Sequence, residues 1–113
     1  MMHKIGIKPV SINQAYRGRR FKTKMLKDYK TDLLLLLPRK LKVPDGKLEV
    51  FYTFGLSNKG ADYDNLIKNF QDILQEAYNF NDNKIYRATI NKCDVKKGEE
   101  FISFKIIPYE ESH

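Results

Sequence analysis

Hydrophobic residues recur with helical spacing in two parts of the chain. The first part begins after Thr23, a residue type that caps helices, and ends at Pro38, which cannot continue one. Its apolar positions are Met25, Leu26, Tyr29, Leu33, Leu36 and Leu37. The apolar positions of the second part are Leu66, Phe70, Ile73, Leu74 and Ala77. These spacings predict two helices, each with one face buried in a core.

Two leucines of the first predicted helix do not fit its buried face. Leu34 and Leu35 fall outside the stripe, so another part of the chain or a second subunit has to cover them. The run from Leu33 to Leu37 is also far shorter than the roughly 20 apolar residues that a membrane helix requires. We therefore expect no membrane association.

The rest of the chain shows the two-residue period of strands. Residues 3–10 predict a short first strand, and residues 48–54 predict a central one, because apolar side chains fall on both of its faces. Residues 84–93 and 100–108 predict an antiparallel hairpin with a loop at 96–99. The order β, basic loop, α, β, α, β, β predicts an α+β fold, with a mixed sheet of about five strands and two helices packed against it.

Length and cysteine content narrow the class of protein. With 113 residues, of which 42% are hydrophobic, the chain fits one domain spanning residues 1–113. The lone Cys93 permits no internal disulfide, and the first residues lack the apolar run of a secretory signal. A cytoplasmic location is the expectation.

The positive charge is concentrated in the first half of the chain. Residues 1–59 contain 14 Lys and Arg against 4 Asp and Glu, whereas residues 60–113 contain 7 against 10, for a total of +7. Cations alternate with aromatic rings between Tyr16 and Lys24, as in segments that bind nucleic acid. A solubilising surface is the alternative reading of this basic segment.

An acidic group interrupts this basic chain at the start of the second predicted helix. Asp62 precedes the helix, and Asp64, Lys68 and Asp72 form a ridge opposite its apolar face. With Asp82, before the next strand, we expect carboxylates to gather at one end of the sheet and hold Mg²⁺, which prefers such oxygen ligands. The alternative is that Asp62 or Asp64 only caps the helix and that the other acids are solvated.

Other metal and nucleophile sites have little support in the sequence. An EF-hand loop starting at Asp62 would need an oxygen ligand at Leu66 and a glycine at Ile67. His3 and His113 lie at the ends of the chain, where solvation is the expected state. Cys93 has no histidine nearby in the sequence, so we expect it to be a packing residue.

The motif Asp62-Tyr63-Asp64-Asn65-Leu66-Ile67-Lys68, followed by Asp72 and Asp82, resembles the RusA-type Holliday junction resolvases. The segment from Pro9 to Asn13, followed by Tyr16 and a basic loop, is similar to the opening of that family. One departure is that the family often has two adjacent acids before the later strand, where this chain has Asp82 flanked by Asn81 and Asn83.

The resemblance implies a homodimer that cuts four-way DNA junctions by paired nicks. It implies that Asp62, Asp64 and Asp82 bind Mg²⁺, or Mn²⁺ in its place, and that Lys68 is the catalytic lysine. The residues expected to contact DNA are Asn13, Tyr16, Arg17, Arg19, Arg20, Lys22 and Lys24. In such a dimer, Leu34, Leu35 and Tyr78 are candidates for the subunit contact.

Two functional hypotheses follow from the sequence. The first is a Mg²⁺-dependent, structure-specific endodeoxyribonuclease acting on branched DNA in recombination and repair. The second is a non-catalytic basic module that binds nucleic acid and uses its acids only as helix caps. A nuclease selective for flaps or single strands is a further alternative within the enzyme class.

Overall fold

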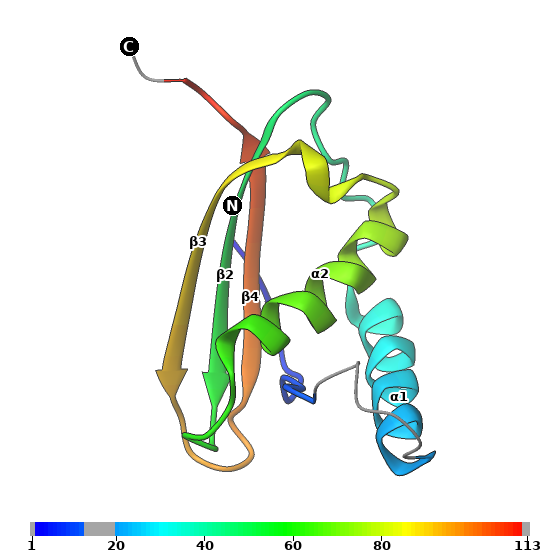
Figure 1. The fold of residues 1–113 in the computed structure, drawn as a ribbon, viewed down its shortest axis with the longest axis vertical. Helices are drawn as coiled ribbons and strands as arrows, with labels where there is room; N and C mark the ends of the chain where they lie inside the picture. Colours follow the sequence, from blue (N-terminus) through cyan, green and yellow to red (C-terminus); the bar gives the residue numbers. More distant parts are fainter. Residues whose placement is uncertain (1, 13–19, 112–113) are drawn as a thin grey trace.

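The computed structural model describes the backbone of residues 2–12 and 20–111, and the side chains of the second range from residue 24 onward. Two α-helices, four strands and one 3₁₀ turn form the fold (Figure 1). In chain order these are β1 (His3–Ile5), α1 (Arg20–Leu36), β2 (Leu48–Leu56), α2 (Tyr63–Tyr78), the turn η1 (Asp82–Lys84), β3 (Ile85–Asp94) and β4 (Phe101–Pro108).

The strands form one mixed sheet in the order β1-β4-β2-β3. Strand β2 pairs in parallel with β3 and antiparallel with β4, and β1 pairs antiparallel with β4. The α+β class, the mixed sheet and the two helices are therefore confirmed, with four strands in place of about five. The central position predicted for β2 is also confirmed.

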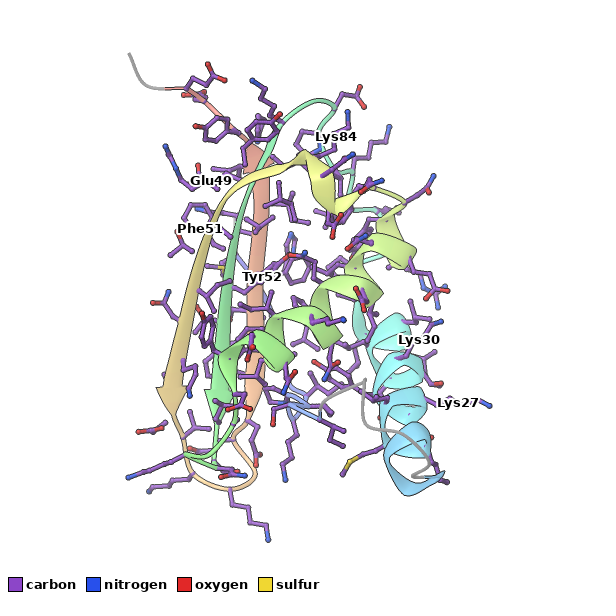
Figure 2. All side chains as sticks on the ribbon, in the orientation of Figure 1. Lys27, Lys30, Glu49, Phe51, Tyr52 and Lys84 are labelled. Carbon is purple, nitrogen blue, oxygen red and sulfur yellow. The ribbon has the colours of Figure 1, made fainter. Side chains whose placement is uncertain are left out.

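Both helices lie on one face of the sheet and bury its apolar side chains (Figure 1). Alternate residues of β2 point toward them, and Figure 2 shows Tyr52 between the sheet and α2. Phe70 of α2 is the centre of this core, because its ring packs edge-on against Tyr52, Phe54 and Phe104 at centroid distances of 5.2–5.9 Å. The salt bridge between Lys30 and Glu76, 2.7 Å long, links α1 to α2 at the surface.

The predicted hairpin of the last two strands is wrong. Strand β2 lies between β3 and β4, so these two strands do not pair with each other. The physical reason is that β2 offers buried apolar residues along its whole length, whereas most of β3 is exposed. The most apolar strand takes the central position, and β3 is left at the edge.

Two boundaries and the burial of one leucine also differ from those expected. Strand β1 has three residues rather than eight, and α1 begins at Arg20 rather than after Thr23, because Arg and Lys are good helix formers that extend it. Leu36, expected in the core, is 52% exposed. Its neighbours Leu34 and Leu35 are 40% and 68% exposed. The end of α1 therefore carries an exposed leucine cluster, consisting of Leu34, Leu35 and Leu36.

Tyr78, a candidate for the subunit contact, is bonded within its own chain and is partly buried. Its hydroxyl donates a hydrogen bond of 2.7 Å to the carbonyl of Pro38, and its ring packs near Phe104. Partial burial raises the pKa of Tyr78 to about 12.

None of the helices in the described part of the chain combines the length and the apolar run needed to cross a membrane.

A close approach between β2 and β4 requires glycine at one position. Gly55 faces Phe101 across the antiparallel pair, and a Cβ atom at Gly55 would lie 2.3 Å from two atoms of the Phe101 ring. The Lys4 ammonium lies 4.5 Å from the centroid of the Phe101 ring. The ring therefore lies directly over the glycine backbone, on the face of the sheet that the helices leave open.

Asn69 connects α2 to the segment that leads into the basic part of the chain. Its side chain is only 2% exposed, and its amide nitrogen donates to the carbonyls of Val10 at 3.0 Å and Ile12 at 2.9 Å. These bonds replace the backbone partners that an irregular segment lacks. Residues 10–12, which precede the basic segment in the sequence, are thus anchored to the same helix that begins with the acidic group.

Replacing Asn69 by Ala should destabilise the protein by about 2–3 kcal/mol, because the carbonyls of Val10 and Ile12 would lose their donors in a part-buried setting. Urea denaturation followed by circular dichroism measures the change in the free energy of unfolding. The control is Asn83→Ala on an exposed turn, which should change it by less than about 0.5 kcal/mol. Equal stabilities of the two variants would contradict the anchoring role.

Candidate metal and nucleic-acid site

Two carboxylates lie where the chain leaves β2 and enters α2. Asp62 occupies the N-cap position of α2, with extended backbone angles, but its side chain makes no capping hydrogen bond. Asp64 lies in the first turn, where one of its oxygens accepts a hydrogen bond of 3.1 Å from the backbone N–H of Asn65. Both side chains are exposed. The alternative that the Asp62 side chain serves as a helix cap is therefore not borne out.

The ridge predicted along α2 is confirmed. Asp64, Lys68 and Asp72 are exposed, while Leu66, Phe70 and Leu74 on the opposite side are fully buried. Lys68 follows Asp64 by four residues, so it lies one turn further along the same side of the helix. The two carboxylates and this ammonium consequently project from one end of α2 into solvent.

A second lysine reaches this site from the sheet. The Lys92 ammonium on β3 donates a hydrogen bond of 2.9 Å to the carbonyl of Ala61, the residue before Asp62. This bond holds the connection between β2 and α2 against the neighbouring strand and adds positive charge beside the carboxylates. Sequence reasoning missed Lys92, because its position depends on the parallel register in which Phe54 is opposite Lys92.

Asp82 does not join Asp62 and Asp64 in this chain, so the expected gathering of three carboxylates at one end of the sheet is wrong. Helix α2 has 16 residues, and at 1.5 Å per residue its ends lie about 24 Å apart. Asp82 follows the far end of α2, at the start of β3. Figure 2 shows Lys84, from the same turn as Asp82, at the end of the sheet opposite to the start of α2.

The physical reason is the parallel pairing of β2 with β3. A chain that leaves the end of one strand and enters a parallel neighbour has to return to the starting end of the sheet, and α2 makes that crossing (Figure 1). Within residues 2–12 and 20–111 no group of three or more His, Cys, Asp or Glu side chains lies close enough to hold a metal ion. A single chain thus offers a pair of carboxylates here.

This pair fits the way in which proteins hold Mg²⁺. The ion keeps several of its waters and is commonly bound through one or two carboxylates together with substrate phosphate oxygens. Asp62 and Asp64 supply hard oxygen ligands in an exposed position, and the Asp62 carboxylate is not used in capping. Lys68 and Lys92 add donors and positive charge within the same region.

A cavity adjoins the start of this site. It has a volume of about 220 Å³ and is bounded by the end of β2, the connection to α2 and residues 8–12. Its apolar walls include Val10, Leu56 and Ala61. At its rim the Ser57 hydroxyl donates to Glu100 at 2.6 Å, which lowers the pKa of that carboxyl. The site thus lies beside a partly apolar hollow.

The expected DNA-contacting residues fall mainly outside the described part of the chain. This applies to Asn13, Tyr16, Arg17 and Arg19. Arg20 and Lys22 lie in the first turns of α1 rather than in a loop, with only their backbone described. Lys24, also on α1, is exposed and forms a 3.1 Å salt bridge with Asp28.

The chain matches none of the known protein-family models and none of the curated proteins against which it was compared. The resemblance to the resolvases therefore rests on the motif quoted above. The functional argument accordingly starts from the geometry of the site.

Proposed function

We propose that this protein is a Mg²⁺-dependent endodeoxyribonuclease that cuts branched DNA, with four-way junctions as its substrate. The observation that carries the proposal is the pair of exposed carboxylates at the start of α2, with the Asp62 side chain not used in capping and with Lys68 one turn away. The contacts of Asp62, Asp64 and Lys68 give little indication that these side chains serve to stabilise the fold. Their chemistry suits a phosphodiester bound through a divalent cation.

The reaction requires positive charge at the scissile phosphate and an activated water, because the anionic oxygens of a phosphodiester repel hydroxide. Mg²⁺ or Mn²⁺, held by Asp62 and Asp64, would supply both. Lys68 stabilises the negative charge that grows on the phosphate oxygens in the transition state. Lys92 keeps the connection before Asp62 in place through its bond to Ala61, which makes it a positioning residue.

The charge distribution supports a nucleic-acid substrate. The chain carries +7, and its basic excess lies in the half that contains the segment from Tyr16 to Lys24. Contacts from these cations to phosphates would orient DNA without reading its sequence. Asn69 anchors residues 10–12, which precede this segment in the sequence, to the helix that carries the carboxylates.

Paired nicks require two sites related by two-fold symmetry, and hence a homodimer. The dimer also gives Asp82 a role that it does not have within one chain. Because Asp82 follows the far end of α2, a helix about 24 Å long, a site with all three carboxylates would take Asp62 and Asp64 from one chain and Asp82 from the partner subunit. We include this arrangement in the proposal.

The rival hypothesis is a basic module that binds nucleic acid without cutting it. Incubating the protein with a labelled synthetic four-way junction and Mg²⁺ or Mn²⁺ separates the two. Paired nicks in the junction support the nuclease, and binding without cleavage in either metal supports the module. Linear duplex and flap substrates in parallel reactions show whether any cleavage is selective for junctions.

Replacing Lys68 by Ala should lower the turnover number on the order of 10²-fold while changing the affinity for the junction by less than about threefold, since Lys68 acts on charge that grows in the transition state. Single-turnover cleavage and a gel-shift titration measure the two quantities. The control is Lys40→Ala, an exposed lysine in the connection between α1 and β2, which should retain wild-type turnover. A Lys68→Ala loss confined to affinity would contradict the catalytic role.

A further inference from the structure

The face of the sheet opposite the two helices has no part in the proposed reaction. This open face consists of Lys4 and the odd-numbered residues of the ranges 49–55, 87–93 and 101–107, as the strand register shows. Figure 2 shows Glu49 and Phe51 on the side of the sheet away from α1 and α2. Most side chains of the open face are exposed or half-buried, so a ligand can reach them.

Aromatic rings form a row along the open face. Phe101 and Phe51 come from the two central strands, and Phe51 is opposite residue 105, so the two rings are four residues apart along β4. Tyr109, four residues further and just beyond the end of β4, packs near Tyr86 at a centroid distance of 5.6 Å. At about 3.4 Å per residue, the row from Phe101 to Tyr109 is about 27 Å long.

Each ring of this row has a cation near its face, 4.5–5.1 Å from the ring centroid. The pairs are Lys4 with Phe101, Lys105 with Phe51, Arg87 with Tyr109, and Lys47 with Tyr86. Glu49 lies 3.8 Å from Arg87 and Glu111 lies 2.6 Å from Lys47, so carboxylates accompany two of the four cations. The row therefore combines aromatic rings with an excess of positive charge.

This combination suits single-stranded nucleic acid. Its bases stack on aromatic rings and its phosphates bind Lys and Arg, whereas in a duplex the neighbouring base pairs cover the faces of the bases. A cation–π contact at an exposed site is weaker than the stacking of a base on a ring. A base can therefore replace the Lys4 or Lys105 ammonium over its ring, while that ammonium moves to a phosphate.

The residues around the rings also suit bases. Thr53, Thr89 and Asn91 are small polar residues of the open face, and they leave room above the sheet and offer hydrogen bonds to base edges. Gly55 gives the Phe101 ring room to lie against the sheet, because any Cβ atom at residue 55 would collide with it. A strand with stacked bases has one phosphate per 3.4 Å, so the row has room for about eight nucleotides.

We infer that the open face binds single-stranded nucleic acid, with bases stacked on Phe51 and Phe101 and phosphates held by Lys4 and Lys105. The inference goes beyond the proposed function and is independent of it, because this binding uses neither the carboxylates at the start of α2 nor a metal ion. A second copy of the chain suits the open face less well, since it would place these cations against their own kind.

Fluorescence anisotropy with a labelled oligothymidylate of about 12 nucleotides tests the inference, in EDTA so that no metal ion takes part. Phe51→Leu and Phe101→Leu keep an apolar side chain but remove the ring, and each should weaken binding at least about fivefold. The matched control is Phe80→Leu, which alters a half-buried ring packed against the core on the helix side and should bind as the wild type does. Oligouridylate of the same length shows whether the open face prefers DNA or RNA.

A strand of abasic sites of the same length separates the rings from the charges. It keeps the phosphates and lacks the bases, so wild-type protein should bind it at least about tenfold more weakly than oligothymidylate. The two Phe→Leu variants should bind the abasic strand as the wild type does.

Salt dependence tests the cations. Lys105→Ala should lower the slope of log K against log salt concentration by about 0.7, the value for one phosphate contact with a single strand. The control, Lys27→Ala on the exposed side of α1, should leave that slope unchanged.

A further measurement uses the unaltered protein and so does not depend on the folding of a variant. An oligonucleotide containing 5-iododeoxyuridine forms covalent links to nearby aromatic rings under ultraviolet light, and mass spectrometry of the digested complex identifies them. The links should fall on Phe51 or Phe101.

Three results would overturn the inference. One is equal affinity of the wild type and both Phe→Leu variants for oligothymidylate, and another is equal affinity of the wild type for the abasic strand. The third is a set of covalent links confined to the basic segment from Tyr16 to Lys24. A protein that binds single strands through the open face but cuts no junction would uphold the inference and contradict the nuclease.

Discussion

Replacing Asp64 by Asn should abolish Mg²⁺-dependent cutting of a four-way junction, with a loss on the order of 10³-fold in rate or more. Asparagine keeps the shape of the side chain but removes the negative charge that holds the cation. Junction binding should stay intact or become tighter, because a negative charge near the DNA phosphates is lost. The exposed position of Asp64 means that the substitution should leave the fold unchanged.

The measurement is single-turnover cleavage of an end-labelled junction, with binding followed in Ca²⁺ to prevent cutting. Asp32→Asn is the control, since Asp32 is exposed on α1 and belongs neither to the acidic motif nor to the turn that carries Asp82. It should cut at the wild-type rate. If Asp64→Asn also cuts at that rate, the carboxylates at the start of α2 are not the metal site.

Mixing two inactive variants should restore cutting if the site is shared between subunits. Asp64→Asn and Asp82→Asn should each be inactive as homodimers. In the mixed dimer, one site combines Asp64 from the second variant with Asp82 from the first and is intact, whereas the other site lacks both. Random exchange makes half of the dimers mixed, so nicking should recover to about a quarter of the wild-type rate.

The control for this mixture is Asp62→Asn with Asp64→Asn. Both residues come from the same chain at each site, so every mixed dimer has two defective sites and should stay inactive. Cutting by Asp82→Asn alone at the wild-type rate would remove Asp82 from the site. If Asp82→Asn is inactive but its mixture with Asp64→Asn recovers nothing, Asp82 is required for some other reason than a shared site.

The fold class was predictable because the apolar pattern carries most of the information about burial. Strand β2 has buried residues throughout, which indicated a central position, and the stripe around Phe70 defined the buried face of α2. The pairing of the strands was harder to predict, because a two-residue period shows which face of a strand is buried but not which strands are neighbours. This is why β3 and β4 were predicted as a hairpin although β2 separates them.

The candidate site was predictable where it depends on local geometry. Asp64 and Lys68 share one side of α2 because they are four residues apart, and that relation needs no tertiary contact. Lys92 could not be found in the same way, because its bond to Ala61 exists only in the parallel register of β2 and β3. The same crossover separates Asp82 from Asp62 and Asp64, because a helix of 16 residues carries the chain to the other end of the sheet.

Gly55 and Phe101 should change together in evolution. The Phe101 ring lies where a Cβ atom of residue 55 would be, so a side chain at 55 is compatible only with a smaller residue at 101. Homologous sequences that keep an aromatic residue at 101 should therefore keep glycine at 55, although 46 positions separate the two. This covariation would identify distant relatives by their sheet, independently of the acidic motif.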